Sequence, residues 1–485
     1  MTAVRTNLVM ARSRAGKGLR AGACALVLFG VACGAATQSE PEWPALAKRW
    51  YDRAEAGYRQ VDLEDAEVSV QNALRVDPER PEIRRLAARI ALAQLEYDRA
   101  VQHLGTLTDS EARALRARAL WYSGRIQEAA DELDRLLADP DVHDAWATEV
   151  AKLARRGAGR TPFRMTGGLL AVSEMPQVQS TAMIVPLELN GEPALGMIAT
   201  GVPEAVVDSS GGDQPSWVSL RFGERLEVKD VPALAQDLSG ISRQVNAPIK
   251  FLIGVNLLRH LNPTVDFTGR QFVVRSFEPP PPPHATTVPL SYVRGGGMML
   301  KAALGIEEAA PSASLLVETS MQFAVALDDE GWKKVGFGVN ELKPVPNAQG
   351  VKTGVLPMLR LGAFELPQVP GVHGAPVDRI QKGLDMDLDG IAGSTLLAAF
   401  RVTLIDGGRA MWLEDMPPEA VGAVPSERAA PSEGEAPLGS EAPDAAAPPA
   451  AGTTPAAPAS PAAPKSAAPA GNPPPPAPKS NAPAR

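Results

Sequence analysis

Hydrophobic positions change their spacing near residue 160. Between residues 41 and 159 apolar side chains recur every three or four positions, as at Ile83, Leu86 and Ile90. This spacing is typical of amphipathic helices that bury one face. Beyond residue 160 apolar and polar positions alternate, which favours half-buried β-strands. We therefore expect a multidomain α + β protein, with a helical region followed by β-rich domains.

Three segments of the helical region look alike. They end in Ala66, Ala100 and Ala129, which lie 34 and then 29 residues apart. The period resembles that of tetratricopeptide repeats, in which a small residue lets paired helices approach closely. Gly124 matches the glycine of that family, whereas Val61 and Leu95 do not. The resemblance implies a docking platform for another protein, and a generic bundle of helical hairpins is the alternative.

The β-rich part contains one order of elements twice. In the first copy a strand and an Asn190-Gly191 hairpin turn lead into Ala199-Thr200-Gly201, and Gly254-Val-Asn256 follows later. Asn-Gly is a strong hairpin signal. In the second copy Glu318-Thr319-Ser320 and Gly393-Ser394 stand at the corresponding places. The run of prolines between the copies predicts a stiff spacer.

This order resembles the retropepsin-like aspartic proteases, in two degenerate copies that would form two all-β lobes, a pepsin-like pseudo-dimer. In that family a β-hairpin leads into Asp-Thr-Gly, and a glycine followed by a short helix crosses beneath that loop. The resemblance implies that Thr200, Gly201, Thr319 and Ser320 brace the two loops. It implies structural glycine-helix elements at Gly254 with Asn256 and at Gly393 with Ser394. An unrelated pair of β-barrels is the alternative.

The catalytic aspartates of this family are replaced. Aspartic proteolysis needs two carboxylates that share one proton. The matching positions hold Ala199, which has no ionisable group, and Glu318, whose extra methylene displaces its oxygens. We therefore expect an inactive scaffold that binds a peptide or protein between its lobes by strand addition. The alternatives are an active aspartic endopeptidase that uses Asp208 with Glu318, and a structural assembly scaffold built through the helical repeats.

The pattern of the first residues predicts an export signal. Basic residues precede an apolar run that ends in small residues at Ala32-Cys33, which is typical of a secretory signal. The segment resembles a bacterial lipoprotein signal, although Gly30 replaces the usual aliphatic residue. That resemblance implies lipidation of Cys33 and a lipid-anchored protein of the cell envelope, at the outer membrane or the periplasmic face. Ordinary secretion is the alternative.

Charge and cysteine content argue against several kinds of ligand, namely nucleic acids, metal ions and cofactors. The net charge is −8, which gives no reason to expect nucleic acid as a partner. The two cysteines, Cys24 and Cys33, both precede the helical region, which argues against a thiolate metal site further along the chain. The five histidines form no HExxH-type cluster and no Gly-rich phosphate loop is present, so we expect no metal site and no cofactor. The expected organisation is a signal peptide (1–32), a linker after the lipidated cysteine (33–40), a helical domain (41–159), lobe 1 (160–278), a polyproline linker (279–285), lobe 2 (286–416) and a disordered Pro/Ala-rich tail (417–485).

Overall fold

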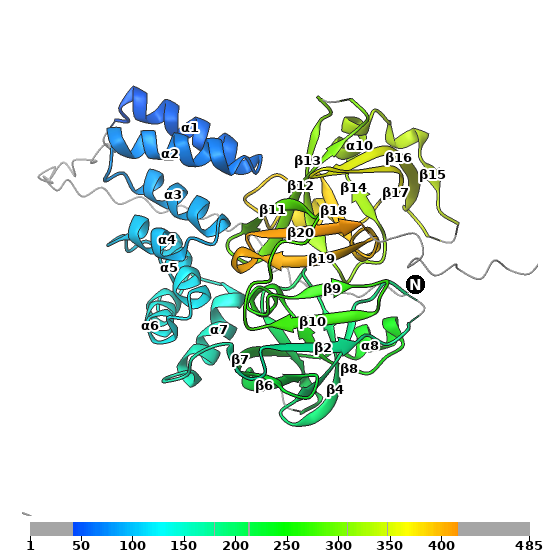
Figure 1. The fold of residues 1–485 in the computed structure, drawn as a ribbon. Coiled ribbons are helices and arrows are strands. Elements are labelled where there is room, and N and C mark those ends of the chain that lie inside the picture. Colours follow the sequence, from blue (N-terminus) through cyan, green and yellow to red (C-terminus); the bar gives the residue numbers. More distant parts are fainter. Residues whose placement is uncertain (1–41, 179, 212–213, 308, 347, 416–485) are drawn as a thin grey trace, which may run out of the picture. The chain divides into compact units, whose positions relative to one another are not determined.

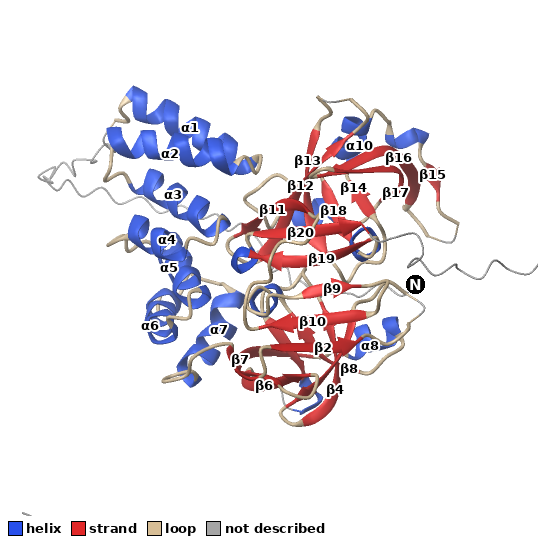
Figure 2. Cartoon of the chain, viewed as in Figure 1, coloured by secondary structure: helices blue, strands red, loops and turns tan. Residues whose placement is uncertain are grey.

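The computed structural model describes residues 42–415, apart from residues 179, 212–213, 308 and 347 (Figure 1). The predicted signal peptide, Cys33 with its linker, and the tail all lie outside the described residues. Helices make up the first part of the described chain and strands make up most of the rest (Figure 2). A helical region followed by two β lobes is thus the observed order. No helix in the described part of the chain is long and apolar enough to cross a membrane.

The helical region consists of consecutive hairpins. Its helices are α1 (Ala45–Arg59), α2 (Leu63–Val76), α3 (Pro81–Ala93), α4 (Tyr97–Leu104), α5 (Ser110–Tyr122), α6 (Ile126–Leu137) and α7 (Ala145–Arg156). Asp109 and Asp144 cap α5 and α7, each accepting a backbone N–H at 3.0 Å from the residue three positions on. Such caps satisfy donors that the first turn of a helix leaves without partners. The capping aspartates Asp109 and Asp144 therefore help to determine where α5 and α7 begin.

Three hairpin turns share one backbone conformation. Val61, Leu95 and Gly124 follow α1, α3 and α5, and all have a positive φ, at 58°, 60° and 78°. In each case the N–H of the next residue donates to the carbonyl five positions earlier, over 2.8 to 2.9 Å. This is the bond of a Schellman turn, which usually contains glycine. The repeat therefore extends to backbone geometry even where the expected glycine is missing, and Ala66, Ala100 and Ala129 are all fully buried.

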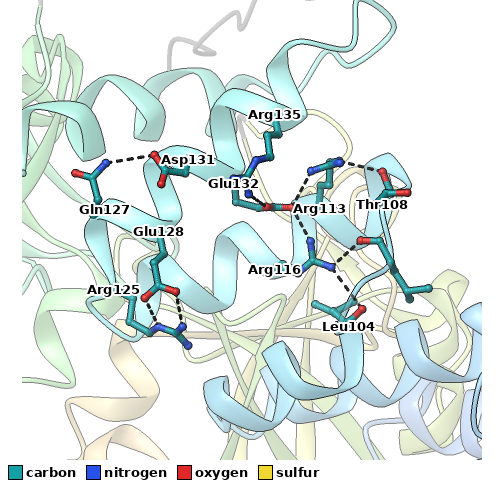
Figure 3. Close-up of polar contacts among 11 residues, drawn as sticks. Leu104, Thr108, Arg113, Arg116, Arg125, Gln127, Glu128, Asp131, Glu132 and Arg135 are labelled. Carbon is teal, nitrogen blue, oxygen red and sulfur yellow. Dashed lines mark hydrogen bonds and ion pairs between the residues drawn. The ribbon is translucent and has the colours of Figure 1, made fainter.

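Ion pairs at the middle of α6 join adjacent hairpins. Glu132 is nearly buried and accepts from Arg113 at 3.3 Å, from Arg116 at 2.7 Å and from Arg135 at 3.1 Å (Figure 3). Arg116 also donates to the Leu107 carbonyl at 2.7 Å, just beyond α4. Burying a carboxylate is unfavourable unless cations or hydrogen-bond donors replace the water that it loses. The cluster therefore connects α4, α5 and α6.

Among the described residues, each β lobe contains ten strands. Lobe 1 comprises β1 (Arg164–Gly167), β2 (Leu170–Glu174), β3 (Ile184–Leu189), β4 (Glu192–Ile198), β5 (Ala205–Asp208), β6 (Ser216–Phe222), β7 (Leu226–Gln236), α8 (Ser239–Val245), β8 (Ile249–Ile253), α9 (Val255–Leu258), β9 (Thr264–Asp266) and β10 (Gln271–Arg275). Lobe 2 comprises β11 (Thr286–Val293), β12 (Gly297–Leu304), β13 (Ser312–Glu318), β14 (Val325–Leu327), α10 (Asp329–Val335), β15 (Lys343–Pro344), β16 (Lys352–Leu361), β17 (Phe364–His373), α11 (Val377–Gln381), β18 (Gly390–Gly393), α12 (Ser394–Leu397), β19 (Phe400–Ile405) and β20 (Ala410–Asp415). The segment that joins the lobes, residues 279–285, contains no helix or strand.

The two lobes pair their strands in the same way. In lobe 1 the order β3-β4-β8-β5-β7-β6 closes on itself through the pairing of β6 with β3. In lobe 2 the order β12-β13-β18-β14-β17-β16 closes in the same way through β16 and β12. The parallel pairs also correspond, since β4 with β8 and β5 with β7 match β13 with β18 and β14 with β17. The chain therefore contains two copies of one six-stranded closed sheet.

A shared sheet connects the two lobes. Its strands follow the order β2-β10-β9-β19-β20-β11, with three strands from each lobe. At its centre β9 pairs antiparallel with β19, and the Thr264 and Thr403 hydroxyls lie 2.8 Å apart. Beside them Arg401 forms an ion pair with buried Asp266 at 2.7 Å. The lobes are thus joined by main-chain hydrogen bonds as well as by the linker.

The helical region packs against both lobes. Ile90 on α3 belongs to one hydrophobic cluster with Val293 and Leu316 of lobe 2. On the lobe 1 side, Trp217 packs with residues of α5 to α7 and donates its indole N–H to the Leu153 carbonyl at 2.9 Å. Part of the helical surface is therefore buried in the interior of the protein and is not available to a partner.

Candidate functional site

Two loops meet where the lobes join. The loop Ala199–Gly201 follows β4, and the loop Glu318–Ser320 begins at the last residue of β13. Each preceding strand runs parallel to a neighbour, β8 or β18, so both loops leave the same edge of equivalent sheets. The strand topology therefore places the two predicted tripeptides at equivalent positions.

Threonines hold the two loops together. The Thr200 hydroxyl donates to the Val317 carbonyl and the Thr319 hydroxyl donates to the Ile198 carbonyl, both at 2.8 Å. Each hydroxyl also accepts the backbone N–H of the other threonine: the Thr200 hydroxyl accepts from Thr319 at 3.0 Å, and the Thr319 hydroxyl accepts from Thr200 at 3.1 Å. Both threonines are at most 3% exposed, where a lost hydrogen bond is costly because water cannot replace it. The reciprocal bonds align the loops with each other.

Glycines allow a second close approach beneath each loop. A Cβ built on Gly254 would lie 2.1 Å from the Glu204 carbonyl oxygen, and one on Gly393 would lie 2.2 Å from the Phe323 carbonyl oxygen. Neither distance leaves room for any side chain. The two glycines therefore let the chain before α9 and α12 pass directly under the loops.

The short helices after these glycines hold the loops through main-chain bonds. Asn256 donates its backbone N–H to the Pro203 carbonyl at 2.8 Å, and Ser394 donates to the Met321 carbonyl at 2.9 Å. Both residues are almost fully buried. The Ser394 hydroxyl also lies 2.8 Å from that of Thr181, which belongs to the other lobe. The glycine-helix residues thus support the loop geometry from below in both copies.

The loop tips bring one carboxylate to the junction. Oε1 of Glu318 accepts the Ser320 N–H at 3.0 Å. Oε2 lies only 1.3 Å from where a Cβ on Gly201 would stand, so the carboxylate contacts the opposite loop. Ala199, at the position equivalent to Glu318, presents a buried methyl group. Within the described residues no second carboxylate forms a hydrogen bond with Glu318.

Asp208 lies elsewhere and has other partners. Its carboxylate forms an ion pair with Lys250 at 2.7 Å and accepts the Leu238 N–H at 3.3 Å and the Ser210 hydroxyl. Burial acts to raise the pKa of Asp208, but the hydrogen bonds and the charge of Lys250 outweigh it and lower the pKa to about 2. Asp208 is therefore an ionised member of a local ion pair.

The strand register explains this separation. Val207 pairs with Phe251, which places Asp208 beside the first half of β8. Ala199 instead donates its N–H to the carbonyl of Ile253, at the other end of that strand. Three residues of strand correspond to roughly 10 Å. The structure thus does not bring Asp208 and Glu318 together.

A small cavity beneath the threonines is apolar. Its volume is about 40 Å³, and its walls include matched pairs from the two lobes. These pairs are Met183 with Met298, Ile198 with Val317, and Leu258 with Leu397. The cavity offers no room for a ligand beyond a few atoms, so it belongs to the packing of the junction.

A buried carboxylate connects the helical region to the first loop. Glu204, three residues after Gly201, accepts indole N–H groups from Trp146 at 3.1 Å and from Trp121 at 3.2 Å. Asn256 also donates to it, at 3.4 Å. The sequence analysis missed Glu204, because its donors lie 58 and 83 residues earlier in the chain. The only indication in the sequence of a role for Glu204 was its position three residues after Gly201.

A buried cation completes this junction. The guanidinium of Arg259 lies 5.2 Å from the ring centres of both Tyr97 and Tyr122. Cations are attracted to the faces of aromatic rings. Burial raises the pKa of Tyr97 to about 12, although Arg259 acts in the opposite direction. The helical region therefore contacts lobe 1 through charged and aromatic groups as well as apolar ones.

In the described part of the chain, no three His, Cys, Asp or Glu side chains are placed to hold a metal ion. The residue predicted to be lipidated, Cys33, lies outside that part.

Comparisons with known proteins give the following similarities. No family model matches this sequence, and no curated protein matches it. A retropepsin-like aspartic protease from Rickettsia conorii is similar to 28% of this chain over 95% of its own length, with 19% identity and a TM-score of 0.21. The aspartic proteinase from Irpex lacteus is similar to 53% of this chain over all of its own length, with 12% identity and a TM-score of 0.35.

Proposed function

We propose that this protein binds an extended peptide segment at the junction of its lobes and does not cleave it. The observation that carries the proposal is the unequal pair of loop tips. The threonine bonds and the glycine-helix supports of an aspartic-protease site are present twice, while the junction holds the single carboxylate of Glu318. Gly201 on the first loop and Gln322, two residues beyond the second loop, are exposed, so solvent reaches both sides of the junction.

A single carboxylate does not support the hydrolytic reaction. One group must accept a proton from water while a second donates one to the peptide carbonyl, and paired acids achieve this by sharing a proton. Ala199 supplies no such group, and Asp208 is held by Lys250. The alternative of an endopeptidase using Asp208 with Glu318 would require Asp208 to leave Lys250 and approach the junction. A role in binding requires no rearrangement.

The test compares cleavage with binding. The full chain is incubated with a random library of octapeptides at each pH from 3 to 7, and products are identified by mass spectrometry. We expect no cleavage and, in parallel, retention of a subset of the peptides on the immobilised protein. Cleavage that the Glu318→Gln variant abolishes would show an active enzyme. Failure to retain any peptide would refute the binding function.

We also propose that the chain is exported and held at a membrane by lipid on Cys33. The support is the sequence alone, namely basic residues, an apolar run and small residues before that cysteine. Expression in bacteria with radiolabelled palmitate tests it. Label should be incorporated into the native chain and lost in Cys33→Ser, and unlabelled secreted protein would contradict the anchor.

A further inference from the structure

Glu318 has no cationic partner in the described part of the chain. Its hydrogen-bond donor is the Ser320 backbone N–H, and no lysine, arginine or histidine among the described residues forms an ion pair with it. The contrast with Asp208 is informative, because that acid is neutralised by Lys250 at 2.7 Å. The junction therefore holds an acidic side chain that no described basic residue pairs with.

This charge lies in a partly desolvated position. Glu318 is half-buried, and its Oε2 occupies the place where a Cβ on Gly201 would stand. Removing a carboxylate from water is unfavourable unless a cation or further donors replace the water. One backbone N–H replaces only part of that hydration. A ligand that supplied a positive charge would provide what the protein itself lacks here.

The surroundings suit a cation on an aliphatic stem. Val202, Met321 and Phe323 flank the loop tips and are half-buried, with part of their apolar surface exposed. Lysine and arginine side chains pack their methylene groups on such surfaces while their charged ends reach a polar group. Half-buried apolar residues beside both loops thus offer surface on which the stem of such a side chain can pack.

We propose that Glu318 binds an ammonium or guanidinium group of the bound peptide. The inference rests on the proposed peptide-binding function and specifies its ligand class, a segment with lysine or arginine placed over the loop tips. A free amino terminus shares this chemistry and is a second source of the same cation.

The experiment selects binders from two random octapeptide libraries on the full-length protein. One library is acetylated and amidated, and the other keeps free amino termini. We expect lysine or arginine to be enriched at one position of the capped peptides. Glu318→Gln should weaken the best capped binder about tenfold, because a charge-assisted hydrogen bond becomes a neutral one. Glutamine can still accept the Ser320 N–H, so this variant should keep the fold.

The matched control is Glu365→Gln, which removes one negative charge from an exposed position on β17. It should leave both enrichment and affinity unchanged. Enrichment confined to the uncapped library would identify the amino terminus as the cation and would support the inference. Peptides that bind without preference for cations, or equally well to Glu318→Gln, would overturn the inference and leave the binding function standing. If neither library yields binders, the proposed function itself fails, and this inference with it.

Discussion

Replacing Thr200 by valine should destabilise the junction without changing its shape. Valine has nearly the same volume as threonine but no hydroxyl. The variant loses the donation to the Val317 carbonyl at 2.8 Å and the acceptance of the Thr319 N–H at 3.0 Å. Both of these groups are buried, so water cannot replace the lost partner.

The expected magnitude follows from these two groups. A buried polar group without a partner costs about 1–3 kcal/mol. Two such groups give a loss of roughly 2–6 kcal/mol in the free energy of unfolding. Thr319→Val removes the mirror-image pair, the donation to Ile198 and the acceptance of the Thr200 N–H. The two variants should therefore be destabilised by similar amounts.

The assay is urea denaturation of the full chain, followed by far-UV circular dichroism. Thr287→Val is the matched control, because Thr287 is exposed on β11 and should change stability by no more than about 0.5 kcal/mol. The reasoning is refuted if Thr200→Val is as stable as the control, or if only one of the two junction variants is destabilised. Either result would mean that the reciprocal bonds do not hold the loops.

Two further predictions concern the supports of the site. Gly254→Ala should destabilise the protein severely, because its Cβ would stand 2.1 Å from a backbone oxygen that cannot move aside; Gly240→Ala, on helix α8 with nothing within 4 Å of the added Cβ, should be neutral or slightly stabilising in the same denaturation experiment. Equal stability of the two alanine variants would contradict the close approach. Asp208→Asn should destabilise the protein at neutral pH, since the folded pKa of Asp208, about 2, lies below its ordinary value of 3.8 and the ionised form is favoured by folding. That difference in stability from the native protein should be present above pH 4 and should vanish as the pH falls through about 2. Unfolding midpoints measured across this range test it. A difference that persists unchanged at pH 2 would show that the charge of Asp208, and hence its ion pair with Lys250, is not the cause of the lost stability.

Much of the site could be predicted from local sequence. The hairpin turn at Asn190-Gly191 has positive φ at both residues. This is expected, because Asn and Gly adopt positive φ at lower energetic cost than other residues. The two ordered sets of strand, tripeptide and glycine-helix correspond to two lobes with matching strand pairings. Such elements depend on neighbours within a few residues, or on a pattern that the chain repeats, and both can be read along the sequence.

Other features required the folded chain. Val61 and Leu95 have positive φ although neither residue favours it, because both are buried in tertiary contacts. Val61 packs with α1 to α3 and lobe 2, and Leu95 packs in the core cluster of the β lobes, so that packing outweighs the local cost. The partners of Glu204 come from α5 and α7, and no spacing rule connects residues so far apart.

The amino-acid sequence by itself determined the order of the elements, the doubling of the β part and the absence of aspartate from both tripeptides. These follow from side-chain type and from periodic burial, which are properties of position along the chain. Only the tertiary structure decided that Glu318 reaches across to Gly201 and that Asp208 is committed to Lys250. Those contacts depend on strand register and on the approach of two lobes, where a shift of one residue would move each carboxylate to a different neighbour.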